Sequence, residues 1–153
     1  MEENKSYHII HSSTTRTDNQ DKRPGIIVLG DSHARGYAGE LLHHVKQHFK
    51  VIGYVKPNAG LTELLNSAKE ETSKLTKKGT VTVRGGTYDI ERNLHRKNLT
   101  SIEKFLDATQ HTSIILIDVP LRYDLGKIPC INKEIMKYNR KLHKVTKRLR
   151  MLN

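Results

Sequence analysis

The sequence is poor in residues that several common classes of protein need. A single cysteine, Cys130, occurs among 153 residues, so an internal disulfide framework cannot form, which fits an intracellular chain. Tryptophan is absent and aromatic residues make up 5%, so we expect an aliphatic core. No apolar run approaches the length of a membrane span, and residues 1–24 lack the apolar stretch of a signal peptide. We therefore expect an intracellular protein, cytoplasmic or nuclear, without a membrane partner.

Acidic residues are also scarce. The chain has 27 Lys and Arg against 16 Asp and Glu, which gives a net charge of +11. Such a balance attracts anions but says nothing about the fold. No metal-ligand spacing and no phosphate-binding glycine loop occurs, so we expect no metal and no cofactor.

The length is that of one domain. Residues 1–24 are polar, mixed in charge and without a sustained period, so we predict a disordered leader that ends at Pro24-Gly25. Across residues 25–153, short apolar runs alternate with segments of helical periodicity. This alternation indicates an α/β domain with parallel strands that helices cover on both faces. The predicted strands are 26–30, 51–55, 80–84 and 114–119, and the helical faces lie within 34–49, 61–68, 99–106 and 132–151.

The last predicted helix, 132–151, has an apolar stripe on one side and a basic face on the other. We predict Asn132 as its N-cap, and Glu134 is the one acidic residue of the segment. Two interpretations of the basic face stay open: a solvated surface, or contact with the phosphate backbone of a nucleic acid. The second interpretation assigns polyanion binding to Lys137, Arg140, Lys141, Lys144, Lys147 and Arg148.

Three loops of distinctive sequence follow the first three predicted strands, at the strand ends where open α/β sheets bind ligands. They read Gly30-Asp31-Ser32-His33, then Ala59-Gly60, then Gly85-Gly86-Thr87-Tyr88-Asp89. A turn between a strand and a helix can display a serine as a nucleophile near the positive end of the helix dipole. Asp31 and Ser32 can equally serve as caps of the helix that follows.

In this order and spacing the loops resemble the sequence blocks of the SGNH/GDSL hydrolase superfamily of serine esterases. The segment 118–124 and the helix that contains Tyr138 and Asn139 also resemble the family's fourth strand, loop and last helix. The resemblance covers residues 26–150. It implies a three-layer α/β/α sandwich around a parallel sheet of flavodoxin-like order 2-1-3-4, and an acyl ester as the substrate.

The resemblance also implies roles for individual residues. Carried over by position, Ser32 is the nucleophile, and the oxyanion hole consists of the Ser32 and Gly60 amides and the side chain at Tyr88. Asp31, Gly86 and Asp89 support these loops. We interpret Tyr88, which stands where the family usually has asparagine, as the product of drift.

The family's general base is missing. No Asp-x-x-His block occurs before the sequence ends at Asn153, so we expect a truncated domain that lacks the fifth strand. A serine hydroxyl is a weak nucleophile without an adjacent base. We expect none of the nine histidines to replace it: His95 is the least unsuitable, and His33 should diverge from Ser32.

Two strand features carry further expectations. Arg84 ends the third strand, where a buried cation needs a partner, and Asp118 is our first candidate and Asp31 our second. Without a fifth strand, 114–119 forms an exposed edge that invites pairing with a second chain.

Two functional hypotheses follow. The first is an SGNH/GDSL-type serine esterase-like domain that is inactive or weakly active, a pseudoenzyme. The alternative is a non-catalytic module that binds nucleic acid or another polyanion through the basic helix.

Overall fold

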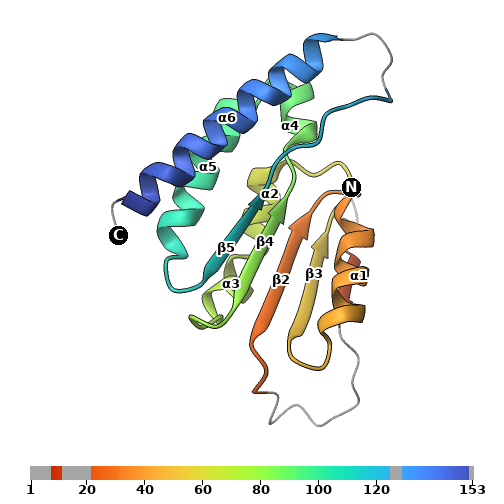
Figure 1. Ribbon diagram of the computed structural model, residues 1–153, viewed down its shortest axis with the longest axis vertical. Helices are drawn as coiled ribbons and strands as arrows, with labels where there is room; N and C mark the ends of the chain where they lie inside the picture. The colour runs from red at the N-terminus through yellow and green to blue at the C-terminus, as the bar shows by residue number, and fades with distance from the viewer. Residues whose placement is uncertain (1–7, 12–21, 125–128, 152–153) are drawn as a thin grey trace, which may run out of the picture.

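The computed structural model describes residues 8–11, 22–124 and 129–151. Its centre is a five-stranded sheet of order β1-β3-β2-β4-β5 (Figure 1). The strands are β1 (His8–His11), β2 (Gly25–Gly30), β3 (Lys50–Val55), β4 (Thr80–Arg84) and β5 (Ser113–Ile117). The helices are α1 (Ala34–Val45), α2 (Leu61–Ser67), α3 (Lys69–Ser73), α4 (Thr87–Glu91), α5 (His95–Ala108) and α6 (Pro129–Met151).

The four predicted strands form the parallel core of the sheet. β2 pairs in parallel with β3 and with β4, and β4 pairs in parallel with β5. Their spatial order is the predicted 2-1-3-4, and β5 is an edge as expected. The four-stranded parallel core and the α/β class are therefore confirmed.

The remaining strand of this sheet, β1, shows that one prediction for the N-terminal segment was wrong. β1 lies within the segment that we predicted as a disordered leader, and it pairs antiparallel with β3, His8 opposite Val55. The sheet is thus mixed in direction at one edge. Four residues are too few to show a strand period, so this pairing escaped the sequence analysis. Residues 1–7 and 12–21 of the predicted leader lie outside the described residues.

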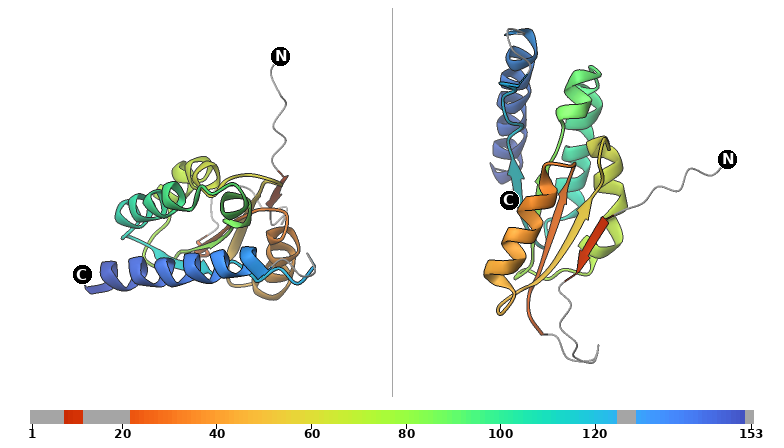
Figure 2. Two further views of the ribbon diagram at one scale, coloured as in Figure 1. Left: turned by 90° about the horizontal axis from the view of Figure 1, so that it is seen from above. Right: turned by 90° about the vertical axis from the view of Figure 1, so that its right-hand side faces the viewer.

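Helices cover both faces of the sheet. Ile27 and Leu29 of β2 belong to a core with α2 and α5, whereas Ile26 and Val28 pack with α1 on the opposite face. Figure 2 shows the sheet between α1 and the layer formed by α2 and α5. A strand buried on both faces has no polar side to expose, which explains the continuous apolar run of β2.

α6 runs beside the β5 edge and contacts α4 and α5 (Figures 1 and 2). Two asparagines hold it against the extended segment that follows β5. The Asn139 side chain accepts a hydrogen bond from the Val119 amide at 3.0 Å and donates to the Val119 carbonyl at 2.9 Å. Asn132 bonds the amide and carbonyl of Arg122 in the same way, at 2.7 and 2.9 Å. These pairs fix the path of residues 119–122.

The prediction that Asn132 is the N-cap of this helix is wrong. α6 begins at Pro129, and Asn132 lies inside it with its amide engaged by Arg122. The predicted strand 114–119 also ends earlier, at Ile117, because Val119 pairs with the Asn139 side chain instead of continuing the sheet.

Candidate active site at the carboxyl ends of the strands

Four strand ends form one row at the carboxyl edge of the sheet. Val55 lies opposite Gly30, Gly30 opposite Arg84, and Arg84 opposite Ile117. Neighbouring strands are about 4.8 Å apart. The loops after β3 and β4 therefore each begin beside the loop after β2. This row brings together the three loops that the sequence analysis singled out.

Gly30 permits the sharp turn from β2 into α1. A Cβ atom at this position would lie 2.2 Å from the Ala34 Cβ and 2.7 Å from the Arg84 carbonyl oxygen. Real atoms do not approach so closely, so no larger residue fits here without a shift of α1 or β4. Gly30 thereby fixes the position of the turn that carries Ser32, at the end of β2.

Ser32 lies on this turn and is exposed to solvent. Asp31, which is buried, shapes the turn: its Oδ1 accepts a hydrogen bond from the His33 amide at 3.0 Å and lies 3.2 Å from His33 Nδ1. In the described part of the chain, the Ser32 hydroxyl has no hydrogen-bond partner. The Asp31 side chain therefore stabilises the turn, whereas α1 begins after His33 without a side-chain cap. The role of Ser32 as nucleophile stays a prediction.

The second loop presents the Gly60 amide at the start of α2. No hydrogen bond to this amide occurs within the described residues, whereas the next amide, that of Leu61, donates to Asp89 Oδ2 at 2.9 Å. A Cβ on Gly60 would lie 3.0 Å from Asp89 Oδ1. Asp89 thus anchors the loop that carries the predicted oxyanion donor.

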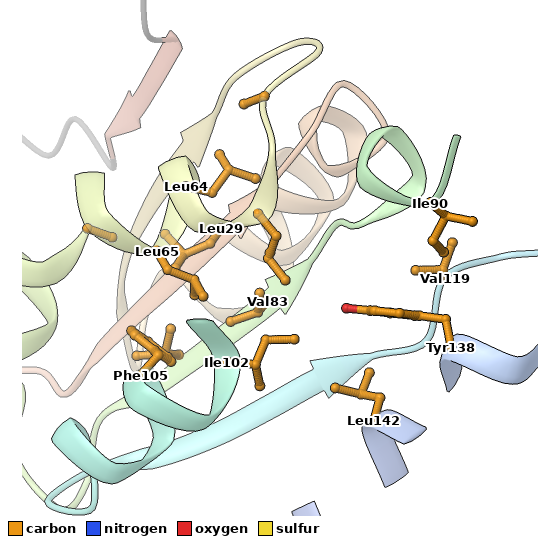
Figure 3. Packing of buried hydrophobic residues seen from close by; sticks show 14 of the residues in the cluster. Leu29, Leu64, Leu65, Val83, Ile90, Ile102, Phe105, Val119, Tyr138 and Leu142 are labelled. Carbon is orange, nitrogen blue, oxygen red and sulfur yellow. The ribbon is translucent and has the colours of Figure 1, made fainter. Parts of the chain in front are cut away.

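Asp89 belongs to a buried polar network that the sequence analysis missed. Its Oδ2 also accepts from Asn98 Nδ2 at 2.9 Å, and Asn98 Oδ1 in turn accepts from the Tyr138 hydroxyl at 2.9 Å. Asp89, Asn98 and Tyr138 are 5%, 1% and 2% exposed. Figure 3 shows the Tyr138 ring directed from α6 into the core toward Val83 and Ile102. The network therefore ties the Gly60 loop, α4, α5 and α6 together.

Burial governs the protonation of this network. Desolvation raises the pKa of Asp89 above its ordinary value, against the opposing effect of its hydrogen bonds from Leu61 and Asn98. Burial, and then the nearby Asp89 charge, raise the pKa of Tyr138, so its hydroxyl stays a donor. One signal could have revealed Asn98: it falls on the same helical face as Ile102 and Phe105, where an apolar residue is expected.

The third loop reaches its helix through Gly86. This residue has φ of 113°, in the left-handed region that favours glycine, and a Cβ there would lie 3.2 Å from Val119. Tyr88 follows in the first turn of α4 and is half-buried. The Arg92 guanidinium lies 4.4 Å from the centre of the Tyr88 ring, a cation–π contact. That Tyr88 arose by drift stays a prediction.

Arg84 does not have either of its predicted partners. Asp118 Oδ1 lies 2.8 Å from His143 Nε2, and Asp31 is engaged by His33. Among the described residues, the buried Arg84 Nε has no hydrogen-bond partner. The expectation failed because Asp118 lies beyond the end of β5, in the segment that α6 holds.

A cluster of charged side chains follows β5. Arg122 donates to Glu91 at 2.5 Å and, through Nε and Nη2, to both oxygens of Asp124 at 2.8 Å. Its guanidinium lowers the pKa of Asp124, and His33 adds a smaller effect in the same direction. Arg122 thereby links α4 to the segment after β5, beside the His33 turn.

Among the described residues, none of the histidine side chains outside β1 is hydrogen-bonded to the Ser32 hydroxyl. His33 turns back to Asp31, His143 bonds Asp118, and His111 Nε2 lies 3.1 Å from the Thr72 carbonyl. His44 lies 3.8 Å from Glu40 on α1. None of these contacts aims an imidazole at Ser32.

The basic face of α6 is formed as predicted, but some of its charges are paired. Lys137 bonds Glu134 at 2.7 Å and Arg148 bonds Glu103 of α5 at 2.6 Å. Within the described residues, Lys141, Lys144 and Lys147 make no ion pair. Across residues 8–11, 22–124 and 129–151, no helix is long and apolar enough to cross a membrane.

Comparison with known proteins supports the fold. No protein-family model matches the chain, and no curated protein sequence does. Among solved structures, it is similar to the crystal structure of a member of the lipolytic protein G-D-S-L family from Veillonella parvula, with a TM-score of 0.64 and 14% identity. The match covers 82% of this chain and 74% of that chain. The chain therefore shares the α/β fold of that protein, and this confirms the fold that the sequence resemblance implied.

Proposed function

We propose that this chain is an SGNH/GDSL-type serine esterase-like domain, with Ser32 at the nucleophile position and little or no ester hydrolysis. The observation that carries the proposal is the Ser32 turn: an exposed serine beside the Gly60 loop, with no base bonded to its hydroxyl within the described residues. The fold shared with a lipolytic protein supports the assignment.

The chemistry follows from these groups. An acyl carbonyl placed against Ser32 would direct its oxygen toward the Ser32 and Gly60 amides, which would stabilise the developing negative charge. The attacking hydroxyl must lose its proton, and without a base this step is slow. Loss of the base in a serine hydrolase lowers turnover by about 10⁶-fold.

Slow covalent labelling tests this proposal. The protein is incubated with a fluorophosphonate probe, with and without added imidazole, and Ser32→Ala is the control. We expect weak labelling that depends on Ser32 and increases with imidazole, which replaces the missing base in solution. Rapid hydrolysis of short nitrophenyl esters that is lost in Ser32→Ala would contradict the weak activity. Labelling that Ser32→Ala leaves unchanged would contradict the assignment of Ser32.

A second candidate function rests on the basic face of α6. Lys141, Lys144 and Lys147, which make no ion pair among the described residues, are exposed on one helix, and such a surface contacts phosphate backbones without sequence preference. We expect weak binding of a labelled single-stranded RNA that decreases steeply as salt increases. Charge reversal at these three positions should abolish it, and binding that survives this change would exclude the helix as the site.

A further inference from the structure

A groove with a volume of about 430 Å³ lies between α5 and α6. The two helices pack side by side (Figure 1), and the residues that line the groove in the described part of the chain all belong to them. Leu99 of α5 and Val145 of α6 supply its apolar part, and both are half-buried. The groove therefore lies apart from the Ser32 turn and from β5.

Three cations from the two helices line this groove. Arg96 of α5 and Lys141 and Lys144 of α6 are exposed, and they make no ion pair within residues 8–11, 22–124 and 129–151. Glu103 also lines the groove, but its carboxylate accepts a hydrogen bond from Arg148 at 2.6 Å. Cations held around one groove repel one another, and an anion bound between them removes this repulsion. The lining residues thus point to a negatively charged ligand.

The cations continue along α6 beyond the groove. Lys137, Lys141, Lys144 and Arg148 follow one another at intervals of four, three and four residues, so they lie on one side of the helix. The first and last of them also bond glutamates. At a rise of about 1.5 Å per residue, this row is about 16 Å long. A single small anion cannot span such a row, whereas a polymer with a regularly repeated charge can.

We propose that this groove binds a single strand of nucleic acid, with phosphates on Arg96, Lys141 and Lys144 and a base against Leu99 and Val145. The proposal rests on the second candidate function, polyanion binding by α6, and adds to it a second helix and the kind of nucleic acid. Single-strand sites combine a positively charged groove along the backbone with a surface for the bases. In the described lining no aromatic residue is present for stacking, so we expect no preference among bases.

The shape of the groove favours a single strand over a duplex. The axes of packed helices are about 8–10 Å apart, so the groove between them is narrower than a nucleic-acid duplex. A duplex also keeps its bases stacked inside, where they cannot reach Leu99 and Val145. An acidic peptide repeats its charge only where its sequence has acidic residues, whereas a nucleic acid has a phosphate in every nucleotide.

Fluorescence anisotropy with fluorescein-labelled decauridylate tests the binding. We expect saturable binding to the full chain in about 50 mM salt that weakens by more than about tenfold in about 200 mM salt, because phosphate contacts release counterions. Decauridylate annealed to decaadenylate should bind at least about threefold more weakly, since its bases cannot enter the groove. A peptide of ten glutamates should compete less well than unlabelled decauridylate.

Matched variants on α5 test the location of binding. Arg96→Glu reverses a charge in the groove and should weaken binding at least about tenfold. Lys104→Glu makes the same change in charge at an exposed position of α5 that does not line the groove. It should weaken binding by less than about threefold, because salt screens distant charges. Circular dichroism checks that both variants are folded.

Methyl NMR gives a second measurement of the location. Titration with decauridylate should shift the methyl resonances of Leu99 and Val145, which line the groove. The methyl resonances of Ile115, which is 51% exposed on β5, should not change.

The outcomes separate this site from the second candidate function. If decauridylate does not bind, both are wrong. If charge reversal of Lys141, Lys144 and Lys147 abolishes binding while Arg96→Glu leaves it unchanged, α6 binds the polyanion by itself and the groove is not the site. Equal or tighter binding of the duplex or of the glutamate peptide would overturn the assignment to a single strand. Saturated binding without a shift at Leu99 or Val145 would also overturn the site.

Discussion

The Ser32 turn and the Asp89 network lie at the same end of the sheet and differ in how they are held. Ser32 is exposed, and its hydroxyl has no partner among the described residues. Asp89, Asn98 and Tyr138 are buried and bonded to one another across three helices. The groups that shape the site are therefore fixed by tertiary contacts, whereas the hydroxyl of the proposed nucleophile makes no such contact within the described residues.

The largest expected effect is at the centre of the network. Asn98→Ala would remove one of the two hydrogen bonds to Asp89 Oδ2, leave the buried Tyr138 hydroxyl without its partner, and open a cavity. We expect the free energy of unfolding to decrease by about 3 kcal/mol, measured by urea denaturation. Asn66→Ala, at an exposed position on α2, is the control and should change it by less than about 0.5 kcal/mol. Equal effects of the two changes would show that the network does not stabilise the fold.

Tyr138→Phe sharpens the comparison by removing one hydrogen bond and keeping the ring. Asn98 Oδ1 would lose its donor, so we expect a decrease of about 1 kcal/mol in the free energy of unfolding. Tyr123→Phe, at an 80% exposed position, should have no measurable effect. A Tyr138→Phe protein as stable as the original would mean that the ring alone matters.

The protonation of Asp89 should be visible in the pH dependence of stability. Because burial raises its pKa above 3.8 in the folded protein, the Asp89 contribution is fully present below 3.8 and is lost as the pH rises through the folded pKa. Asn at this position can accept the same two hydrogen bonds and does not titrate. We expect the stability of the original protein relative to Asp89→Asn to decrease as the pH rises from 3.5 to 7, measured by urea denaturation at each pH.

The exposed carboxylates change stability with pH in the opposite direction. Because both proteins contain them, their contributions cancel in the difference in stability between the original protein and Asp89→Asn. Arg122 lowers the pKa of Asp124 and Lys137 lowers that of Glu134, so both contribute stability that is lost on acidification. A relative stability that is constant or increases with pH would contradict a raised pKa at Asp89.

The smallest effect is expected at Ser32. Its hydroxyl is exposed and unbonded in the described structure, so Ser32→Ala should change the free energy of unfolding by less than about 0.5 kcal/mol while it abolishes fluorophosphonate labelling. A loss of more than about 1 kcal/mol would show that Ser32 has a structural role after all.

The sequence allowed the parallel core and the three loops to be predicted because their signals are local. The apolar run of β2 and the turn at Gly30 and Ser32 are legible without knowledge of their neighbours. Two predictions that depended on neighbours failed. Asp118 was predicted as the partner of Arg84, but its carboxylate contacts His143. Asn132 was predicted as the N-cap of the last helix, but its side chain bonds the backbone of Arg122. Each error concerns a polar group whose partner lies on another element.

The sequence by itself determined the α/β class, the order in which strands and helices follow one another, and the placement of Ser32 after the first parallel strand. Periodicity and turn residues encode these features within a few positions of the chain. Only the tertiary structure decided that β1 extends the sheet, that Asn98 joins Asp89 to Tyr138, and that Arg96 and Lys141 line one groove. These depend on packing between segments that are nine to more than forty residues apart, where no local pattern specifies the partner of a hydrogen bond or the width of a gap.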